Sequence, residues 1–393
     1  MVLGGSTRAF KALRDFPIIV TLAFVSIVCV AAGLIFSAAS YAQSSVTLYG
    51  IISGGIGYVS NEGGKPAITA LSGTLQNNRW GLQGIEDLGG GLQAIFALDN
   101  AFNTMNGNTA YGLMFGRQAY VGLSGAPWGM ITLGRQFEVS FDYLSEYSMM
   151  AAGTGLGAHI GDNDNILGSV HYNNSIKYRT PTVRGVQGEL MYAMSNTSSV
   201  AENRLFSAGV SYKQGPLKMG VAYSDLTRPG TVINASGAAT VDYVGVPFVL
   251  FHTSPLSASV GVKQQRVVGA GGRYNLGSVA LAAIITDVRF NYLDNTSLHL
   301  TNYDANVAWF AQPDVKLSVG YTYTSGKYGG FDRSSHWNMA QTGIDYFLSK
   351  RTDLALFVNY GMVHDGQVVM YTVSPSAMNA NQLLIAAAYR HKF

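Results

Sequence analysis

The 393-residue sequence has few charges, few prolines and a single cysteine. Charged residues make up 12% of the chain, which is about half of the share usual in soluble domains. After residue 40, no apolar run approaches the roughly 18 residues that a transmembrane helix needs. Low charge combined with 47 glycines and 23 tyrosines is instead typical of a transmembrane β-barrel, whose strands alternate between lipid-facing and lumen-facing residues.

The first 42 residues have the composition of a secretory signal peptide. Three basic residues precede an apolar run over residues 17–39, and Ser40-Tyr41-Ala42 resembles a small-residue cleavage site. An uncleaved helical anchor is the alternative, because the apolar run is longer than most signal cores. We expect residues 1–42 to be removed, which leaves 43–393 as the barrel domain. The only cysteine, Cys29, would be lost, so the mature chain could hold no disulfide, thiol nucleophile or thiolate metal site.

Sequence motifs for catalysis, metal binding or nucleic-acid binding are also lacking. Without residues 1–42 the charge is nearly balanced, which argues against a nucleic-acid partner. The seven histidines form no H-x-x-x-H or H-E-x-x-H pair, and no G-x-S-x-G nucleophile motif is present. We therefore expect no enzymatic activity, cofactor or metal site, with an outer-membrane lipase or protease as the remaining enzymatic alternative.

Period-two alternation is the strongest pattern in the rest of the chain. From 315 to 324, valine, leucine and tyrosine alternate with lysine, serine, glycine and threonine, and residues 206–213, 217–224 and 354–362 repeat the pattern. These runs are longer than the roughly 5–6 residues usual for strands of a soluble sandwich. They predict long antiparallel strands with one apolar and one polar face.

The connections between these segments alternate in length. Seven short turns fall at 87–90, 125–128, 180–183, 214–216, 276–278, 312–314 and 349–352. Eight long, polar connections fall at 60–75, 102–112, 137–169, 197–202, 227–264, 291–298, 326–335 and 365–381. Short turns on the periplasmic rim and long loops on the extracellular rim are typical of an outer-membrane barrel. The pattern predicts an all-β fold, a 16-stranded antiparallel transmembrane β-barrel wide enough for an aqueous channel, although residues 240–262 could hold one more hairpin.

The third long connection, 137–169, is far longer than a hairpin loop and contains no lysine or arginine. Its acids are Glu138, Asp142, Glu146, Asp162 and Asp164. The arginines in the strands before it are Arg79, Arg117 and Arg135. We expect the loop to fold into the barrel and face the arginines, which makes a charged constriction in a water-filled pore. The alternatives are local salt bridges or subunit contacts for the arginines, and a solvated loop or a loose calcium site for the acids.

Several motifs resemble the general porins of β-proteobacterial outer membranes. The opening Ser45-Val46-Thr47-Leu48-Tyr49-Gly50 is similar to their first strand. Residues 79–91, from Arg79-Trp80-Gly81-Leu82 to the turn at 87–90, are similar to their second strand and turn. The strands at 117–123 and 132–136, Asn173-Asn174-Ser175 and the C-terminal Phe393 also fit. Two departures are His171, near the place where the family usually has an arginine, and a longer 227–264 loop.

The resemblance implies a homotrimer in the outer membrane of a Gram-negative bacterium, with passive diffusion of ions and small hydrophilic solutes. It also implies contacts with outer-membrane lipid and lipopolysaccharide, and recognition of Phe393 by the barrel-assembly machinery as an assembly signal. We expect Gln118 and Thr132 on outward faces, where contact with another chain explains polar residues better than lipid does. A substrate-selective channel for a sugar or organic anion, or a loop-mediated adhesin, remains the alternative, because Phe141, Tyr143 and Tyr147 could stack on a sugar.

Overall fold

The computed structural model describes residues 44–230, 236–245, 250–366, 369, 376–377 and 380–393. The predicted signal peptide, residues 1–42, lies outside these described residues. Within the described ranges, no helix is both long enough and apolar enough to cross a membrane.

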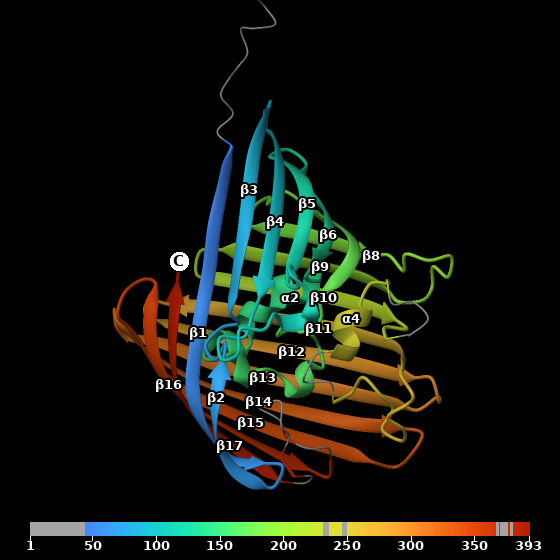
Figure 1. Cartoon of the computed structure of the whole chain (residues 1–393), viewed down its shortest axis with the longest axis vertical. Helices are drawn as coiled ribbons and strands as arrows, with labels where there is room; N and C mark the ends of the chain where they lie inside the picture. Colours follow the sequence, from blue (N-terminus) through green and yellow to red (C-terminus); the bar gives the residue numbers. More distant parts are fainter. Residues whose placement is uncertain (1–43, 231–235, 246–249, 367–368, 370–375, 378–379) are drawn as a thin grey trace, which may run out of the picture.

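In the described part of the chain, seventeen antiparallel β-segments form one closed sheet, whose strands surround a central space (Figure 1). β1 (Ser45–Glu62) pairs with β17 (Asn381–Lys392), which closes the barrel. β2 (Lys65–Ser72) and β3 (Arg79–Gly89) both pair with β1 and are two halves of one barrel strand. The seventeen segments therefore make sixteen barrel strands, which confirms the predicted fold.

The other strands follow one another around the wall, each paired with its sequence neighbours. They are β4 (Leu92–Ala101), β5 (Gln118–Gly125), β6 (Gly129–Gln136), β7 (Tyr172–Arg179), β8 (Val186–Ala193), β9 (Arg204–Gln214), β10 (Leu217–Thr227), β11 (Val262–Leu276), β12 (Val279–Tyr292), β13 (Ser297–Gln312), β14 (Val315–Gly329), β15 (Ser334–Phe347) and β16 (Thr352–His364). All seven predicted short turns join consecutive strands at one end of the barrel.

The prediction of a long loop at 60–75 is wrong. β1 and β2 instead meet in a tight hairpin at Gly63 and Gly64, whose φ angles of +62° and +96° favour glycine. The break in pairing falls later, at 73–78, between β2 and β3. At 240–262 the described residues form the short helix α4 (Thr240–Gly245) and an isolated bridge between Thr253 and Gly261, and not a further hairpin.

The apolar faces of the strands point out of the barrel. Val319 and Leu356 are 55% and 48% exposed, whereas Thr324 and Asn359 are fully buried on the inner side. A soluble protein would bury the first pair and expose the second. This inverted distribution is the one that lipid on the outside and polar contents on the inside require.

Gln118 and Thr132 point into the barrel, contrary to the sequence prediction. Gln118 lines an interior cavity, and the Thr132 hydroxyl donates a hydrogen bond to Gln136 Oε1 at 2.6 Å. The exposed neighbours Val121 and Leu133 set the outward parity of β5 and β6, and the two polar residues have the opposite parity. Because both side chains point inward, they give no evidence for a contact between subunits.

The C-terminus completes the closing pair of strands. The Phe393 backbone N–H donates to the Gly50 carbonyl and its carbonyl accepts from the Gly50 N–H, each at 3.1 Å. The Phe393 ring lies directly over Gly50, where a Cβ would come within 2.2 Å of the ring. An aromatic ring that covers a glycine on the neighbouring strand is a known way to pin sheet register.

Candidate functional site

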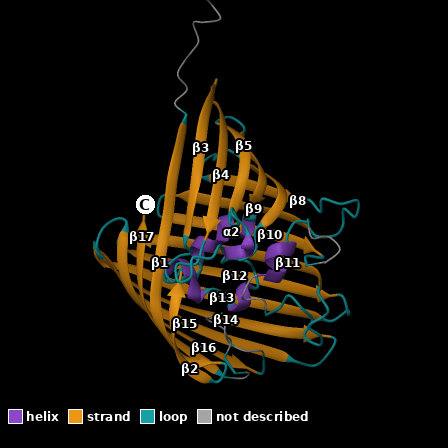
Figure 2. Ribbon diagram, in the orientation of Figure 1, coloured by secondary structure: helices purple, strands orange, loops and turns teal. Residues whose placement is uncertain are grey.

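The connection between β6 and β7, which we call L3, lies inside the barrel. It contains the short helices α2 (Val139–Leu144), η2 (Ser145–Tyr147), α3 (Met149–Ala152), η3 (Gly155–Gly157) and η4 (Ile160–Asp162). Figure 2 shows these helices surrounded by the strand wall. The inward course of L3 therefore matches the sequence prediction.

Glycines on the inner wall let L3 lie against the strands. A Cβ on Gly220 in β10 would lie 2.5 Å from the Tyr143 carbonyl oxygen, and one on Gly320 in β14 would lie 2.4 Å from Met149 Cγ. Such separations are too short for real side chains. Because these glycines have no side chains, L3 can pack directly against this part of the wall. The opposite side of the lumen therefore stays open.

A buried histidine fixes the far part of L3 to the wall. His159 Nδ1 lies 2.6 Å from Asp164 Oδ2, and His159 Nε2 lies 3.4 Å from an Asp304 oxygen on β13. Thr286 on β12 also donates to Asp164 at 2.6 Å. Burial alone would lower the pKa of His159, but Asp164 and Asp304 raise it to about 10. The ring is therefore a cation at neutral pH. Its ion pair with Asp164, which Thr286 on β12 also contacts, anchors L3 to the wall.

Two further acids hold the base of L3. Asp162, at a φ of +44°, accepts the backbone N–H groups of Leu167 and Ser169 at 2.9 and 3.0 Å. Glu138 is 1% exposed and accepts hydrogen bonds from Asn165 at 2.7 Å and from the Tyr172 hydroxyl at 3.3 Å. Burial raises the pKa of Glu138 to about 7, although the hydrogen bonds oppose this rise.

The raised pKa of Glu138 predicts a pH-dependent loop. A folded-state pKa of about 7 against an ordinary 4.5 means that the contribution of this group to stability is complete below pH 4.5 and is lost as pH rises to 7. The resulting decrease in the free energy of unfolding is of the order of 3 kcal/mol. We expect backbone amides of residues 160–170 to exchange hydrogen faster at pH 8 than at pH 5, after correction for intrinsic rates.

Glu138→Gln should remove most of this difference, because the amide keeps an acceptor oxygen and cannot ionise. The matched control is Glu146→Gln, at an acid that pairs with Lys218 and should leave the pH dependence of L3 unchanged. Equal pH dependence in wild type and Glu138→Gln would show that Glu138 does not control the loop.

Arg135 lies at the foot of L3, in a buried polar cluster. One terminal nitrogen donates to both carboxylate oxygens of Asp242 in α4 at 2.6 Å, and the other donates to Asn173 Oδ1 at 2.6 Å. The Asp242 carboxylate also accepts the His171 backbone N–H at 2.8 Å. A pairing irregularity between Gly134 and Gln136 turns Arg135 inward although Ile131 and Leu133 face outward. Arg135 thus ties L3 to the loop that carries α4.

The open side of the lumen holds a cavity of about 580 Å³. From L3 it is lined by Asp142, Glu146 and the stacked rings of Phe137 and Phe141, whose centroids lie 4.1 Å apart. The charged residues that line it from the wall are Arg79, Asp99, Arg117, Lys316 and Arg390. Carboxylates of L3 and basic groups of the wall therefore border the same cavity.

Each acid that lines the cavity has a basic partner. Arg117 Nε lies 3.1 Å from Asp99, Lys177 Nζ lies 2.6 Å from Asp142, and Lys218 Nζ lies 2.7 Å from Glu146. Burial would raise the pKa of Asp142, but Lys177 and Arg179 lower it, so this carboxylate is ionised.

Arg79 differs from the other basic groups of the wall. Among the described residues it forms no salt bridge, and it donates only to the Asn77 carbonyl at 3.4 Å. Arg390 pairs with Asp353 at 2.7 Å. Among the residues that the structure describes, the cavity therefore holds one positive charge, Arg79, without a direct counter-charge.

The structure brings four of the predicted constriction residues together at this cavity, namely Arg79, Arg117, Asp142 and Glu146. The other four predicted residues do not line it and instead make internal bonds. These are Arg135, Glu138, Asp162 and Asp164. Residues that the sequence analysis did not single out include Asp99, Lys177, Lys218, Lys316 and Arg390, although strand parity already placed several of them on an inner face.

Comparison with known proteins identifies the family. Residues 27–366 match the Gram-negative porin family. An outer membrane porin of Bordetella pertussis is 36% identical over 218 residues, which cover 49% of this chain and 56% of that porin, so the match spans a little over half of the relative's length.

Two solved structures share the fold. An anion-selective porin from Comamonas acidovorans has a TM-score of 0.71 at 22% identity, over 89% of this chain and 100% of that one. The trimer form of OmpT, an outer membrane protein of Vibrio cholerae, has a TM-score of 0.63 at 13% identity, over 89% and 99% of the two chains. Together with the closed barrel, the family match shows that this chain belongs to the Gram-negative porins of the bacterial outer membrane.

Proposed function

We propose that the chain forms a water-filled channel through which ions and small hydrophilic solutes diffuse passively, with L3 as its constriction. The observation that carries the proposal is the cavity of about 580 Å³ between L3 and the wall, bordered by charges of both signs. Such a lining favours hydrated, polar solutes. The proposal assigns no catalytic role to the chain, because its family consists of channels.

Liposome swelling tests this function. Liposomes that contain the purified protein should swell in isotonic solutions of small sugars, and the rate should fall as the sugar becomes larger. Liposomes with heat-unfolded protein are the control. Swelling no faster than that control, for the smallest sugar, would contradict a diffusion channel.

The same cavity supports a weak preference for anions. Its three acids each have a basic partner, whereas Arg79 has no direct counter-charge among the described residues. One similar structure is that of an anion-selective porin. A positive excess within a narrow passage raises the local concentration of anions.

A sugar-selective channel has less support. Tyr143 and Tyr147 are 6% and 1% exposed and pack against the wall, so they cannot stack on a passing sugar. Phe137, Phe141 and Tyr49 line the cavity, but only the first two are stacked on each other. This arrangement is a short aromatic patch and not a ladder along the passage.

We further propose that the chain assembles as a homotrimer, since one of the similar solved structures is a trimer form. Residues 1–42 would be removed as a signal peptide before assembly. Neither proposal depends on the charge of the constriction.

We propose that Phe393 serves assembly of the barrel and not the pore. Phe393→Ala removes the ring that covers Gly50 at the closing pair of strands, so we expect a several-fold lower yield of folded protein with unchanged single-channel conductance. Trp309→Ala is the matched control, because Trp309 is an outward aromatic at the same end of the barrel, 45% exposed against 42% for Phe393. Equal yields for the two variants, or an altered conductance of folded Phe393→Ala, would contradict this role.

A further inference from the structure

The cavity between L3 and the wall has two chemically different sides. From L3 it is lined by apolar groups of Phe141, Met150 and Leu167, all of which are half-buried. From the strand wall it is lined by the guanidinium group of Arg79 and the phenol of Tyr49. A small hydrated ion uses only the second side. The apolar side therefore indicates a solute that has apolar surface as well as charge.

Phe141 supplies an aromatic ring on the L3 side. It stacks on Phe137, with ring centroids 4.1 Å apart and planes 16° apart. Phe137 is only 4% exposed, whereas Phe141 keeps part of its surface at the cavity. Behind the pair lies Gly168, where a Cβ would come within 2.7 Å of Phe141 Cδ2. The ring is thus fixed before a solute arrives, and a preorganised ring favours a planar aromatic solute.

Arg79 keeps most of its hydrogen-bond donors available. One terminal nitrogen donates to the Asn77 carbonyl at 3.4 Å. In the part of the chain that the structure describes, Nε and the other terminal nitrogen have no protein partner. The Tyr49 hydroxyl lies over Gly81, two residues along the same inner face of β3, where a Cβ would come within 2.8 Å of it. A guanidinium fork with a phenol beside it suits the two oxygens of a planar carboxylate.

The other charged groups that line the cavity already have partners within the described residues. The pairs are Arg117–Asp99, Asp142–Lys177, Glu146–Lys218, Lys316–Asp345 and Arg390–Asp353. These pairs leave one guanidinium group for a ligand. One free guanidinium suits a single carboxylate better than a phosphate dianion, which needs more positive charge.

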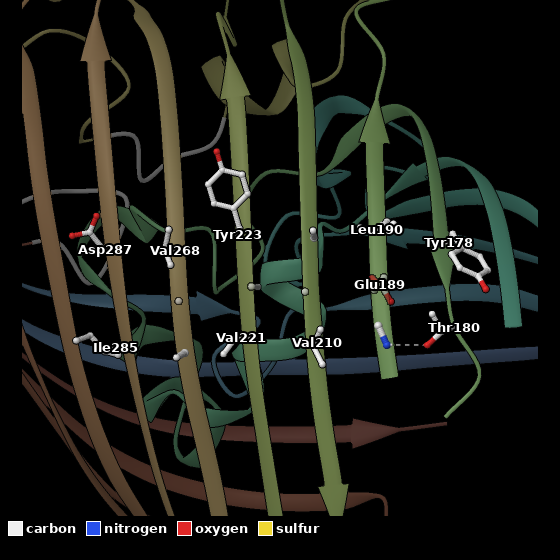
Figure 3. Close-up of a pocket in the computed structure, with 16 residues that line it drawn as sticks. Tyr178, Thr180, Glu189, Leu190, Val210, Val221, Tyr223, Val268, Ile285 and Asp287 are labelled. Carbon is white, nitrogen blue, oxygen red and sulfur yellow. Dashed lines mark hydrogen bonds between the residues drawn. The ribbon is translucent and has the colours of Figure 1, made fainter. Parts of the chain in front are cut away.

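A groove of about 760 Å³ on the outer face of the barrel differs from this cavity (Figure 3). Val210, Val221 and Ile285 line it, and their side chains point away from the lumen. In a porin this face lies outside the water-filled passage. Dissolved solutes therefore meet apolar surface and an unpaired positive charge together at the cavity beside L3, and not at this groove.

We propose that the constriction binds planar aromatic monocarboxylates of the size of benzoate, with the ring against Phe141 and the carboxylate on Arg79 and the Tyr49 hydroxyl. The cavity volume of about 580 Å³ lies within the range of small-molecule sites. The inference rests on the proposed channel, because the solute reaches the site through the lumen. It goes beyond a weak preference for anions, since the ring has its own binding surface.

Block of the single-channel KCl current by added solutes tests the site, together with saturation-transfer NMR of the same solutes on the detergent-solubilised protein. The probes are benzoate, acetate, which has the charge without the ring, and benzamide, which has the ring without the charge. We expect benzoate to half-block the current at a concentration about tenfold or more below that of either other probe.

Two variants separate the two sides of the site. Arg79→Gln should raise the half-blocking concentration of benzoate about tenfold and leave that of benzamide within about twofold. Phe141→Leu keeps an apolar side chain without the ring, so it should raise the value for benzoate about threefold or more and leave that for acetate unchanged. Should Arg79→Gln fail to fold, Gln83→Glu places a carboxylate at the same cavity and should weaken benzoate alone.

The matched controls lie away from the cavity. Lys65→Gln removes an exposed basic group of the β1–β2 hairpin, and Trp309→Leu removes an outward aromatic ring that is 45% exposed. Both should leave the half-blocking concentration of benzoate within about twofold of wild type. Equal losses from Phe141→Leu and Trp309→Leu would overturn the proposal.

Equal block by benzoate and acetate in an open wild-type channel would also overturn the proposal and leave the diffusion channel intact. A wild-type protein that conducts no current but binds benzoate in the NMR experiment, with losses in Arg79→Gln and Phe141→Leu, would refute the channel and support the site. Absence of both current and binding would contradict both.

Discussion

A chain without Met149–Ile160 is expected to carry a larger single-channel current than the intact chain. This part of L3 contains α3 and η3, which occupy the lumen beside β13, β14 and β15. Its removal replaces packed side chains by water, so the conducting cross-section grows. We expect the conductance to rise about 1.5-fold or more in planar bilayers at 1 M KCl.

A single substitution should change the current in the opposite direction. Gly320→Leu places a side chain where Met149 now lies against the wall, because a Cβ there would approach Met149 Cγ to 2.4 Å. The substitution should push α3 towards the open cavity and reduce the current. Gly261→Leu is the control, since no atom lies within 4 Å of a Cβ at that position. Unchanged conductance in both the deletion and Gly320→Leu would mean that L3 does not limit the flow.

Neutralising the charges at the cavity should shift ion selectivity in opposite directions. Arg79→Gln/Arg117→Gln should favour cations, and Asp142→Asn/Glu146→Gln should favour anions. A unit charge about 8 Å from the path contributes roughly 0.5 kcal/mol in water, and more beside low-dielectric walls. The permeability ratio should therefore change about two- to fivefold, measured as a reversal potential in a KCl gradient.

Two controls distinguish a local field from overall charge. Arg289→Gln removes a basic group from the outer face, and Glu138→Gln removes an acid buried in the base of L3. Neither should move the reversal potential. All shifts should become smaller at 1 M salt, where the screening length falls to about 3 Å from about 10 Å at 0.1 M. Equal shifts from Arg289→Gln and from the Arg79/Arg117 pair would contradict a constriction at this cavity.

The barrel could be predicted from the sequence because the residue pattern that produces it repeats in strand after strand along the chain. Each strand needs an apolar face for lipid, and every second connection must be short, so the alternation and the turn spacing predict the architecture directly. The inward path of L3 was predictable for a related reason. A stretch of more than thirty residues with five acids and no lysine or arginine has few other stable positions in a barrel with arginines in its wall.

The roles of individual charges in the site could be predicted only in part. A pairing irregularity at Gly134 changes the direction of Arg135 and places it against Asp242, more than a hundred residues away in the sequence. Glu138 and Asp164 are also acids of L3, but local turns bury them, whereas Asp142 reaches the cavity from α2. Composition and spacing do not determine which of two acids a turn buries.

Reaction of an engineered cysteine tests the central claim, that L3 narrows a water-filled pore, most directly. Cys29 lies within the predicted signal peptide, so a mature chain would carry only the cysteine that is introduced. Glu146→Cys places a thiol at the cavity between L3 and the wall, and Asp332→Cys places one in the exposed loop between β14 and β15. A bulky thiol reagent should lower the single-channel current of Glu146→Cys and leave that of Asp332→Cys unchanged. Complete modification of Glu146→Cys, verified by mass, without any change in current would contradict the constriction.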